Sequence, residues 1–163
     1  MTTPASFSTG RRFALALGAV ALVASTAVFA AAPINTLKNS LFGGSTDTAI
    51  NGYDTVAYFT MGKPVKGLDN LVTDWMGAKW KFSSQANLDL FKATPDKYAP
   101  QYGGYCAFGV SRGYLVKVEP DQFTVREGKL YLNYDADVQK QWLKDPAGYI
   151  KLADAKFADL LKK

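Results

Sequence analysis

Apolar residues recur in this chain with two different periods, the period of two of a β-strand and the period of 3.6 of an α-helix. Segments with the strand period and segments with the helix period form separate groups along the sequence. Residues 78–82 alternate between apolar side chains and lysines, the period of two that is typical of a half-buried strand. Residues 149–161 carry apolar side chains at helical spacing. Because strand-like and helix-like segments do not alternate regularly, the sequence predicts an α+β fold, a small antiparallel sheet with helices packed on it, rather than a doubly wound parallel sheet.

Glycine-containing turns separate the segments that we predict to be strands. Gly77 and Gly128 each lie between two short apolar segments, which predicts two antiparallel hairpins. A further segment, upstream of both, is rich in β-branched and aromatic residues and also predicts a strand. The predicted strands are residues 55–60, 71–73, 78–82, 122–125 and 130–134.

Capping residues mark where the predicted helices begin. Ser83 or Ser84 can accept a hydrogen bond from the first turn of a helix that covers about residues 84–93. Asp135 offers a cap for a short helix, and Asp145, followed by a proline at the first helical position, offers a cap for the last one. The sequence therefore predicts that the chain ends in helices that pack on the sheet.

Residues 1–30 have the three parts of a signal peptide. Arg11 and Arg12 precede an apolar run of about 17 residues, and the segment ends in the small residue Ala30. Because that run is at the lower limit of a membrane span, we expect cleavage after Ala30 and no stable membrane insertion afterwards. The arginine pair fits a twin-arginine signal as well as the ordinary secretory route. We expect an exported protein, periplasmic if the source is a Gram-negative bacterium.

Charge and residue types argue against several classes of function. Removing residues 1–30 lowers the formal net charge from +5 to +3, and no basic run remains that would bind nucleic acid. The chain has no histidine, which is the usual base of catalytic triads and a common ligand of zinc, copper and iron. These features favour a binding module over a hydrolase or a His-based metalloenzyme.

Residues 31–48 end near a Gly/Ser cluster and predict a linker or N-terminal arm, followed by one domain over residues 49–163. Four segments of that domain carry a family pattern in a fixed order. They are residues 52–59 (Gly-Tyr-Asp-Thr-Val-Ala-Tyr-Phe), 80–84 (Trp-Lys-Phe-Ser-Ser), 97–107 (Lys-Tyr-Ala-Pro-Gln-Tyr-Gly-Gly-Tyr-Cys-Ala) and 128–134 (Gly-Lys-Leu-Tyr-Leu-Asn-Tyr). Together they resemble the YHS family, in its exported single-domain branch of (seleno)proteins.

The resemblance implies a YHS-like α+β domain and a role connected with metal handling or an active thiol. In some relatives the Gly-Gly-Tyr-Cys segment is the position of selenocysteine, which implies a chemically active thiol at Cys106. The family is named after a Tyr-His-Ser motif, and this chain has no histidine to match it. A metal site would therefore have to hold a soft ion such as copper through Cys106 and ligands other than histidine.

Three roles are open for Cys106, the only cysteine in the chain. In a thiol-based redox protein Cys106 would be catalytic, with good access to solvent, a lowered pKa and an external thiol as partner. In a metal-binding protein it would be a ligand of a soft metal ion. In a structural or interaction protein it would be a small buried residue beside Ala107 and Phe108.

The tyrosine-rich loop from Tyr98 to Cys106 is the region where we expect a small ligand or a soft metal ion to bind. Its tyrosines can line a pocket or pack in the core, and its glycine pair allows backbone conformations closed to other residues or an ordinary tight turn. Asp54 can orient a tyrosine hydroxyl or cap its own turn, and Arg112 is the nearest cation in sequence to Cys106. The candidate binding residues are Asp54, Tyr98, Tyr102, Gly103, Gly104, Tyr105, Cys106 and Arg112.

Overall fold

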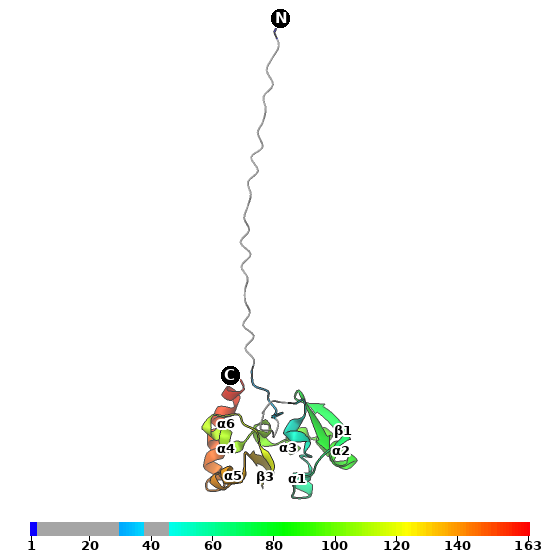
Figure 1. Ribbon diagram of the computed structural model, residues 1–163, viewed down its shortest axis with the longest axis vertical. Coiled ribbons are helices and arrows are strands. Elements are labelled where there is room, and N and C mark those ends of the chain that lie inside the picture. The colour runs from blue at the N-terminus through cyan, green and yellow to red at the C-terminus, as the bar shows by residue number, and fades with distance from the viewer. Residues whose placement is uncertain (3–29, 38–45) are drawn as a thin grey trace.

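The computed structural model describes residues 1–2, 30–37 and 46–163 of the chain, so the predicted signal peptide lies almost wholly outside the described residues. In chain order the elements are the 3₁₀ helix η1 (Ala49–Gly52), α1 (Ala57–Thr60), β1 (Leu68–Trp75), β2 (Ala78–Phe82), α2 (Gln85–Ala93), α3 (Pro95–Tyr98), the 3₁₀ helix η2 (Gln101–Gly104), α4 (Ala107–Arg112), β3 (Glu119–Arg126), β4 (Lys129–Asn133), α5 (Ala136–Trp142) and α6 (Pro146–Leu160). Figure 1 shows α1, α2 and β1 on one side of the domain and α4, α5 and α6 on the other. The predicted α+β class with C-terminal helices is confirmed.

Two separate hairpins replace the single small sheet that was predicted. β1 pairs with β2 and β3 pairs with β4, in both cases antiparallel. Each pair turns through two residues with positive φ, residues 76–77 in the first hairpin and residues 127–128 in the second. Such two-residue turns match the right-handed twist of paired strands. The alternation along residues 78–82 places Trp80 and Phe82 in the core, as the period of two predicts.

The predicted caps of the longer helices are confirmed. The Ser84 side chain accepts a hydrogen bond from the backbone of Asn87 at the start of α2. Asp135 caps α5 in the same way, and Asp145 caps α6, where a proline occupies the first turn. Each cap satisfies a backbone N–H that has no partner within its own helix.

The strand predicted over residues 55–60 is wrong, because residues 57–60 form the short helix α1. The carboxylate of Asp54 accepts hydrogen bonds from the backbone N–H groups of Val56 at 2.9 Å and Ala57 at 3.3 Å. These bonds start a helical turn at residues whose β-branched and aromatic side chains would otherwise favour a strand. The capping carboxylate of Asp54 therefore outweighs the local β propensity of residues 55–60.

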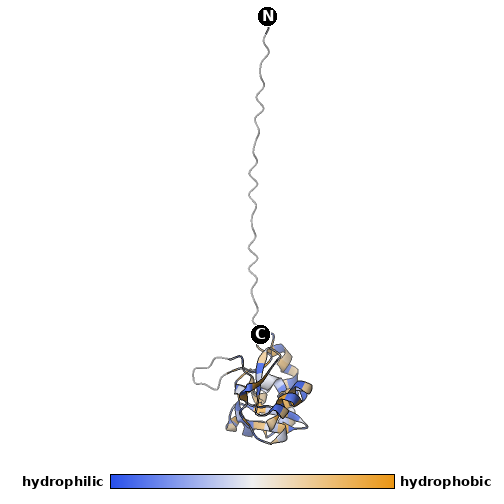
Figure 2. Ribbon diagram, turned by 90° about the vertical axis from the view of Figure 1, so that its right-hand side faces the viewer, coloured by the Kyte–Doolittle hydropathy of each residue, from blue (hydrophilic) through white to orange (hydrophobic). Residues whose placement is uncertain are grey.

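Two clusters of buried side chains fill the domain. The larger contains Trp80, Phe82 and Phe91 beneath the first hairpin, and the second contains Tyr131 and Trp142 beneath α4 and α6. In Figure 2 the helices alternate between hydrophobic and hydrophilic residues, as expected when one face of each is buried. No helix in the described ranges is long and apolar enough to cross a membrane.

Residues 31–37, within the predicted linker or arm, pack on the domain. Ile34 and Asn35 are buried. The Asn35 side chain donates a hydrogen bond to the carbonyl of Gly104 at 2.8 Å, and its backbone N–H donates to the carbonyl of Gly103 at 2.8 Å. This segment thereby holds the far end of the tyrosine-rich loop in place.

Candidate functional site

The loop from Tyr98 to Cys106 takes its shape from three consecutive residues in the left-handed region. Tyr102, Gly103 and Gly104 have φ values of 56°, 60° and 83°. A Cβ atom on Gly103 would lie 1.9 Å from the carbonyl oxygen of Pro33, and one on Gly104 would lie 2.1 Å from Cδ1 of Ile50. Both glycines are thus required by close approach as well as by φ, because backbone atoms of Pro33 fill the space beside Gly103 and the Ile50 side chain fills the space beside Gly104.

The tyrosines of this loop point in different directions and bind protein groups. The Tyr102 hydroxyl donates to the carboxylate of Asp154 at 2.8 Å, whereas the Tyr105 hydroxyl donates to the carbonyl of Ala32 at 3.0 Å. Burial, and for Tyr102 the neighbouring Asp154, raises the pKa of both phenols. Tyr98 is buried, with its ring edge-on to the ring of Phe59. Only Tyr102 also faces a cleft, described below.

Cys106 is enclosed in the core, at 1% exposure. Its sulfur caps α4 by accepting a hydrogen bond from the N–H of Gly109 at 3.3 Å, and it lies 3.8 Å from Oδ1 of Asn133. Burial raises the pKa of the thiol and outweighs the opposing effect of the Gly109 N–H. A buried, protonated thiol is a poor nucleophile and a poor metal ligand. The structure therefore favours the packing role among the three roles considered for this residue.

This placement predicts slow alkylation of Cys106. In the folded protein, iodoacetamide at neutral pH should label the thiol at least about 100-fold more slowly than in denaturant, because reaction requires local opening followed by thiolate formation. Intact-mass spectrometry at timed intervals measures both rates. Rapid labelling of the folded protein would contradict the enclosed position.

The other two candidate residues are also held by protein groups. Asp54 is fully buried, and its carboxylate accepts hydrogen bonds from Ser83 and Asn87 in addition to those at the start of α1. Arg112, at the opposite end of α4 from Cys106, lies over the rings of Phe108 and Tyr149 at 5.1 and 5.8 Å. Both arrangements are those of structural residues.

A soft metal ion does not fit Cys106. In the part of the chain that the structure describes, no group of three or more His, Cys, Asp or Glu residues could hold a metal ion. The sulfur is already engaged by Gly109 and Asn133 and is closed off from solvent. The copper-like site that the resemblance implied has no support in these contacts.

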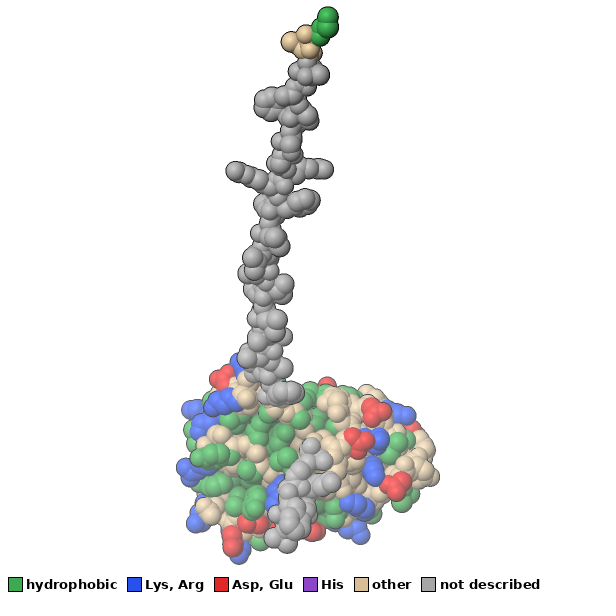
Figure 3. All heavy atoms as spheres, turned by 45° about the horizontal axis from the view of Figure 1, so that its top comes forward, with side chains coloured by type: hydrophobic (Ala, Val, Ile, Leu, Met, Phe, Trp, Pro, Cys, Tyr) green, Lys and Arg blue, Asp and Glu red, His purple; other side chains and the backbone are tan. Residues whose placement is uncertain are grey.

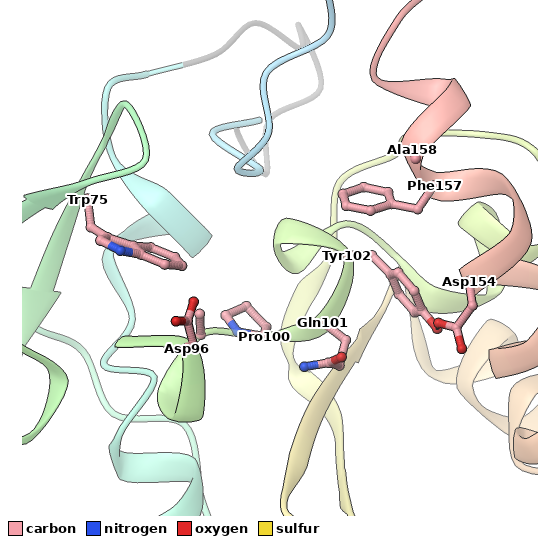
Figure 4. Close-up of a pocket in the computed structure, with 9 residues that line it drawn as sticks. Trp75, Asp96, Pro100, Gln101, Tyr102, Asp154, Phe157 and Ala158 are labelled. Atoms are coloured by element: carbon pink, nitrogen blue, oxygen red, sulfur yellow. The ribbon is translucent and has the colours of Figure 1, made fainter. Parts of the chain in front are cut away.

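A cleft of about 400 Å³ opens on the outer side of the loop. Trp75 at the end of β1 forms one wall, α6 forms the opposite wall, and the start of α3 and the loop lie between them (Figure 4). The lining residues are Trp75, Asp96, Ala99, Pro100, Gln101, Tyr102, Asp154, Phe157 and Ala158. Four consecutive lining residues, 99–102, belong to the predicted binding region.

The cleft includes residues that the sequence analysis did not single out. Trp75 lies just before the predicted hairpin turn at Gly77, and Phe157 falls within the segment 149–161 that was predicted to be an amphipathic helix. Phe157 is half-buried, with its ring edge-on to Tyr102 at 5.6 Å, so it belongs both to the packing and to the wall of the cleft. Asp96 and Asp154 are exposed residues with no local pattern to mark them. That α3 and α6 line the same cleft depends on the tertiary fold.

These features describe a small α+β domain with an aromatic-walled cleft beside a loop that two glycines shape. The family model described as YHS domain matches residues 56–102, which confirms the predicted resemblance to the YHS family over this part of the chain. The resemblance to the exported (seleno)protein branch of that family stays a prediction. The match runs from α1 to Tyr102 and includes the first hairpin, but it ends before Cys106 and the C-terminal helices. Neither the curated proteins nor the solved structures include a significant match to the chain.

Proposed function

We propose that this protein is an exported YHS-domain binding module that holds a small organic ligand in the cleft between Trp75 and Phe157. The observation that carries the proposal is the cleft itself, because its volume lies within the range of small-molecule sites. It combines aromatic walls with a few polar groups, the usual composition of such sites. Cys106 lies outside it and takes no part in binding.

The walls of the cleft are formed before any ligand enters. The Trp75 indole is fixed by edge-on contacts with the rings of Trp80 and Phe91, at 5.6 and 5.7 Å between centroids. Across the cleft the Tyr102 ring is fixed by its hydroxyl bond to Asp154. Rigid walls lower the entropy that is lost on binding. The proposal is one of binding rather than catalysis, since the one thiol is buried and the Tyr102 hydroxyl is committed to Asp154.

Blocking the cleft should abolish binding. We suggest three soluble probes that share a phenyl ring and differ in charge: benzyl alcohol, benzoate and benzyltrimethylammonium. Ala158 is exposed on α6 and lines the cleft, so Ala158→Trp should weaken whichever probe binds by at least about 10-fold by filling the space. Ligand-detected NMR titration measures the affinities.

The matched control is Leu152→Trp, an exposed position on the same helix that does not line the cleft. It should leave the affinity unchanged. If none of the three probes binds the unmodified protein, or if both variants bind equally well, the binding proposal is wrong.

The position of Ala31 supports export with cleavage after Ala30. The backbone N–H of Ala31 donates a hydrogen bond to the carbonyl of Leu161 at 3.1 Å, at the end of α6. A cut after Ala30 would turn this nitrogen into an ammonium group beside the negative end of a helix dipole, a favourable position. Protein from the exported fraction should have the intact mass of residues 31–163. A mass that includes residues 1–30 would contradict cleavage.

A further inference from the structure

We propose that the cleft selects an organic cation, such as a quaternary or primary ammonium compound with an apolar body. This inference rests on the binding function proposed above and specifies the chemistry of its ligand. Two features carry it, the sign of the charges that line the cleft and the nature of its walls. Neither feature depends on Cys106 or on a metal ion.

All the charged side chains that line the cleft are acidic. Asp96 comes from the first turn of α3 and Asp154 from the middle of α6, and no lysine or arginine is among the described lining residues. The chain as a whole has 19 basic and 14 acidic residues, so the local charge is opposite to that of the molecule. Figure 3 shows basic and acidic side chains interspersed over the face that it draws. The cleft therefore attracts a cation and repels an anion.

The basic residues nearest in sequence to the two carboxylates, Lys97 beside Asp96 and Lys156 beside Asp154, do not line the cleft. The Lys97 ammonium lies 5.0 Å from the centre of the Tyr98 ring, and Lys97 is not among the residues that line the cleft. The Asp154 carboxylate accepts a hydrogen bond from the Tyr102 hydroxyl. Because that hydroxyl is neutral, it does not cancel the negative charge of the carboxylate. Both acidic groups can therefore act on a bound ligand.

Aromatic walls add a second attraction for a cation. Trp75, Tyr102 and Phe157 present rings to the cleft (Figure 4), and the face of an aromatic ring, best of all an indole, attracts a cation. The same chemistry already occurs within this protein, where Lys66 lies over Tyr53 at 4.5 Å and Lys117 over Tyr134 at 4.4 Å. A small, strongly hydrated metal ion would gain little from such walls, whereas an alkylammonium group can contact them directly.

Tryptophan fluorescence can test the selectivity on the full folded domain. Trp80 and Trp142 are 1% and 0% exposed, so Trp75 is the half-buried indole that a ligand in the cleft would reach. Benzyltrimethylammonium should change the emission and bind at least about fivefold more tightly than benzyl alcohol, and benzoate should bind most weakly. Raising the salt concentration should weaken the cation selectively.

Two charge-removing variants complete the experiment. Asp96→Asn and Asp154→Asn should each weaken benzyltrimethylammonium by about threefold to tenfold while leaving benzyl alcohol unchanged. The Asp154→Asn side chain keeps an oxygen that can accept a hydrogen bond from the Tyr102 hydroxyl. Asp137→Asn, on α5 outside the cleft, is the control for a change of net charge and should have no effect.

The outcomes separate this inference from the binding proposal. If benzyl alcohol or benzoate binds as tightly as the cation, or if the two variants bind the cation as the unmodified protein does, the cation inference is overturned and the cleft remains a small-molecule site. If no probe of any charge binds, the binding proposal itself is overturned.

Discussion

Replacing Gly104 by alanine should lower the free energy of unfolding by about 2 to 5 kcal/mol. One part of this effect is the cost of holding a side chain at φ 83°, about 1 to 2 kcal/mol for a residue in the left-handed region. The other is overpacking, typically about 1 to 3 kcal/mol, because the new Cβ would lie 2.1 Å from Cδ1 of Ile50, a fully enclosed core residue. Gly104→Val should be at least as damaging. Equilibrium denaturation measures both.

Gly128 provides the control that separates the two parts. It also has a positive φ, 71°, but a Cβ there would meet no atom within 4 Å. Gly128→Ala should therefore cost only the conformational part, about 1 to 2 kcal/mol. Equal losses at Gly104 and Gly128 would show that the tight packing of the loop against Ile50 adds nothing to stability.

Replacing Asp54 by alanine should lower the free energy of unfolding by about 3 to 5 kcal/mol. The carboxylate is fully buried and accepts hydrogen bonds from the backbone of Val56 and Ala57, from both the backbone and the hydroxyl of Ser83, and from the side chain of Asn87. Each buried donor left without a partner costs about 1 to 3 kcal/mol. Loss of the acceptor therefore disconnects α1 from the end of β2 and the start of α2.

The Asp54→Asn variant tests whether these donors need an anionic acceptor. One amide oxygen can still accept at the start of α1, but the amide NH₂ would face the donors of Ser83 and Asn87, which lie 2.6 to 2.8 Å from Oδ2. We expect a smaller but clear loss, about 2 kcal/mol. Asp89→Ala, at an exposed position on α2, should change stability by less than about 0.5 kcal/mol. If Asp54→Ala is as mild as Asp89→Ala, the buried network is not a source of stability.

The hairpins and the longer helices were predictable because their signals are local. The turns at residues 76–77 and 127–128 need only a glycine between two apolar segments, and the caps Ser84, Asp135 and Asp145 act within three residues of themselves. The strand wrongly predicted at residues 55–60 also reflects interactions between residues close in sequence. There, the Asp54 carboxylate caps the first turn of α1, whereas the predicted strand followed from the β propensity of the residues after it.

The candidate site was predictable only in part. Residues 99–102 of the predicted loop do line the cleft, and Gly103 and Gly104 do require positive φ. The direction in which each tyrosine points was not predictable, because Tyr102 binds Asp154 on α6 and Tyr105 binds Ala32 on the N-terminal segment, both about fifty or more residues away. The burial of Cys106 was likewise not predictable from local sequence, because its sulfur contacts Asn133 of β4, 27 residues away.

The sequence by itself determined where the turns, caps and amphipathic faces lie, since each follows from side chains a few residues apart, and it determined the YHS resemblance through short segments. Only the tertiary structure decided that Cys106 is a buried cap and that Trp75, Asp96 and Asp154 line one cleft. Trp75, Asp96 and Asp154 lie on β1, α3 and α6, and their proximity results from how the first hairpin, α3 and the last helix pack in the folded domain. Such contacts join residues far apart in the chain, so no local pattern encodes them.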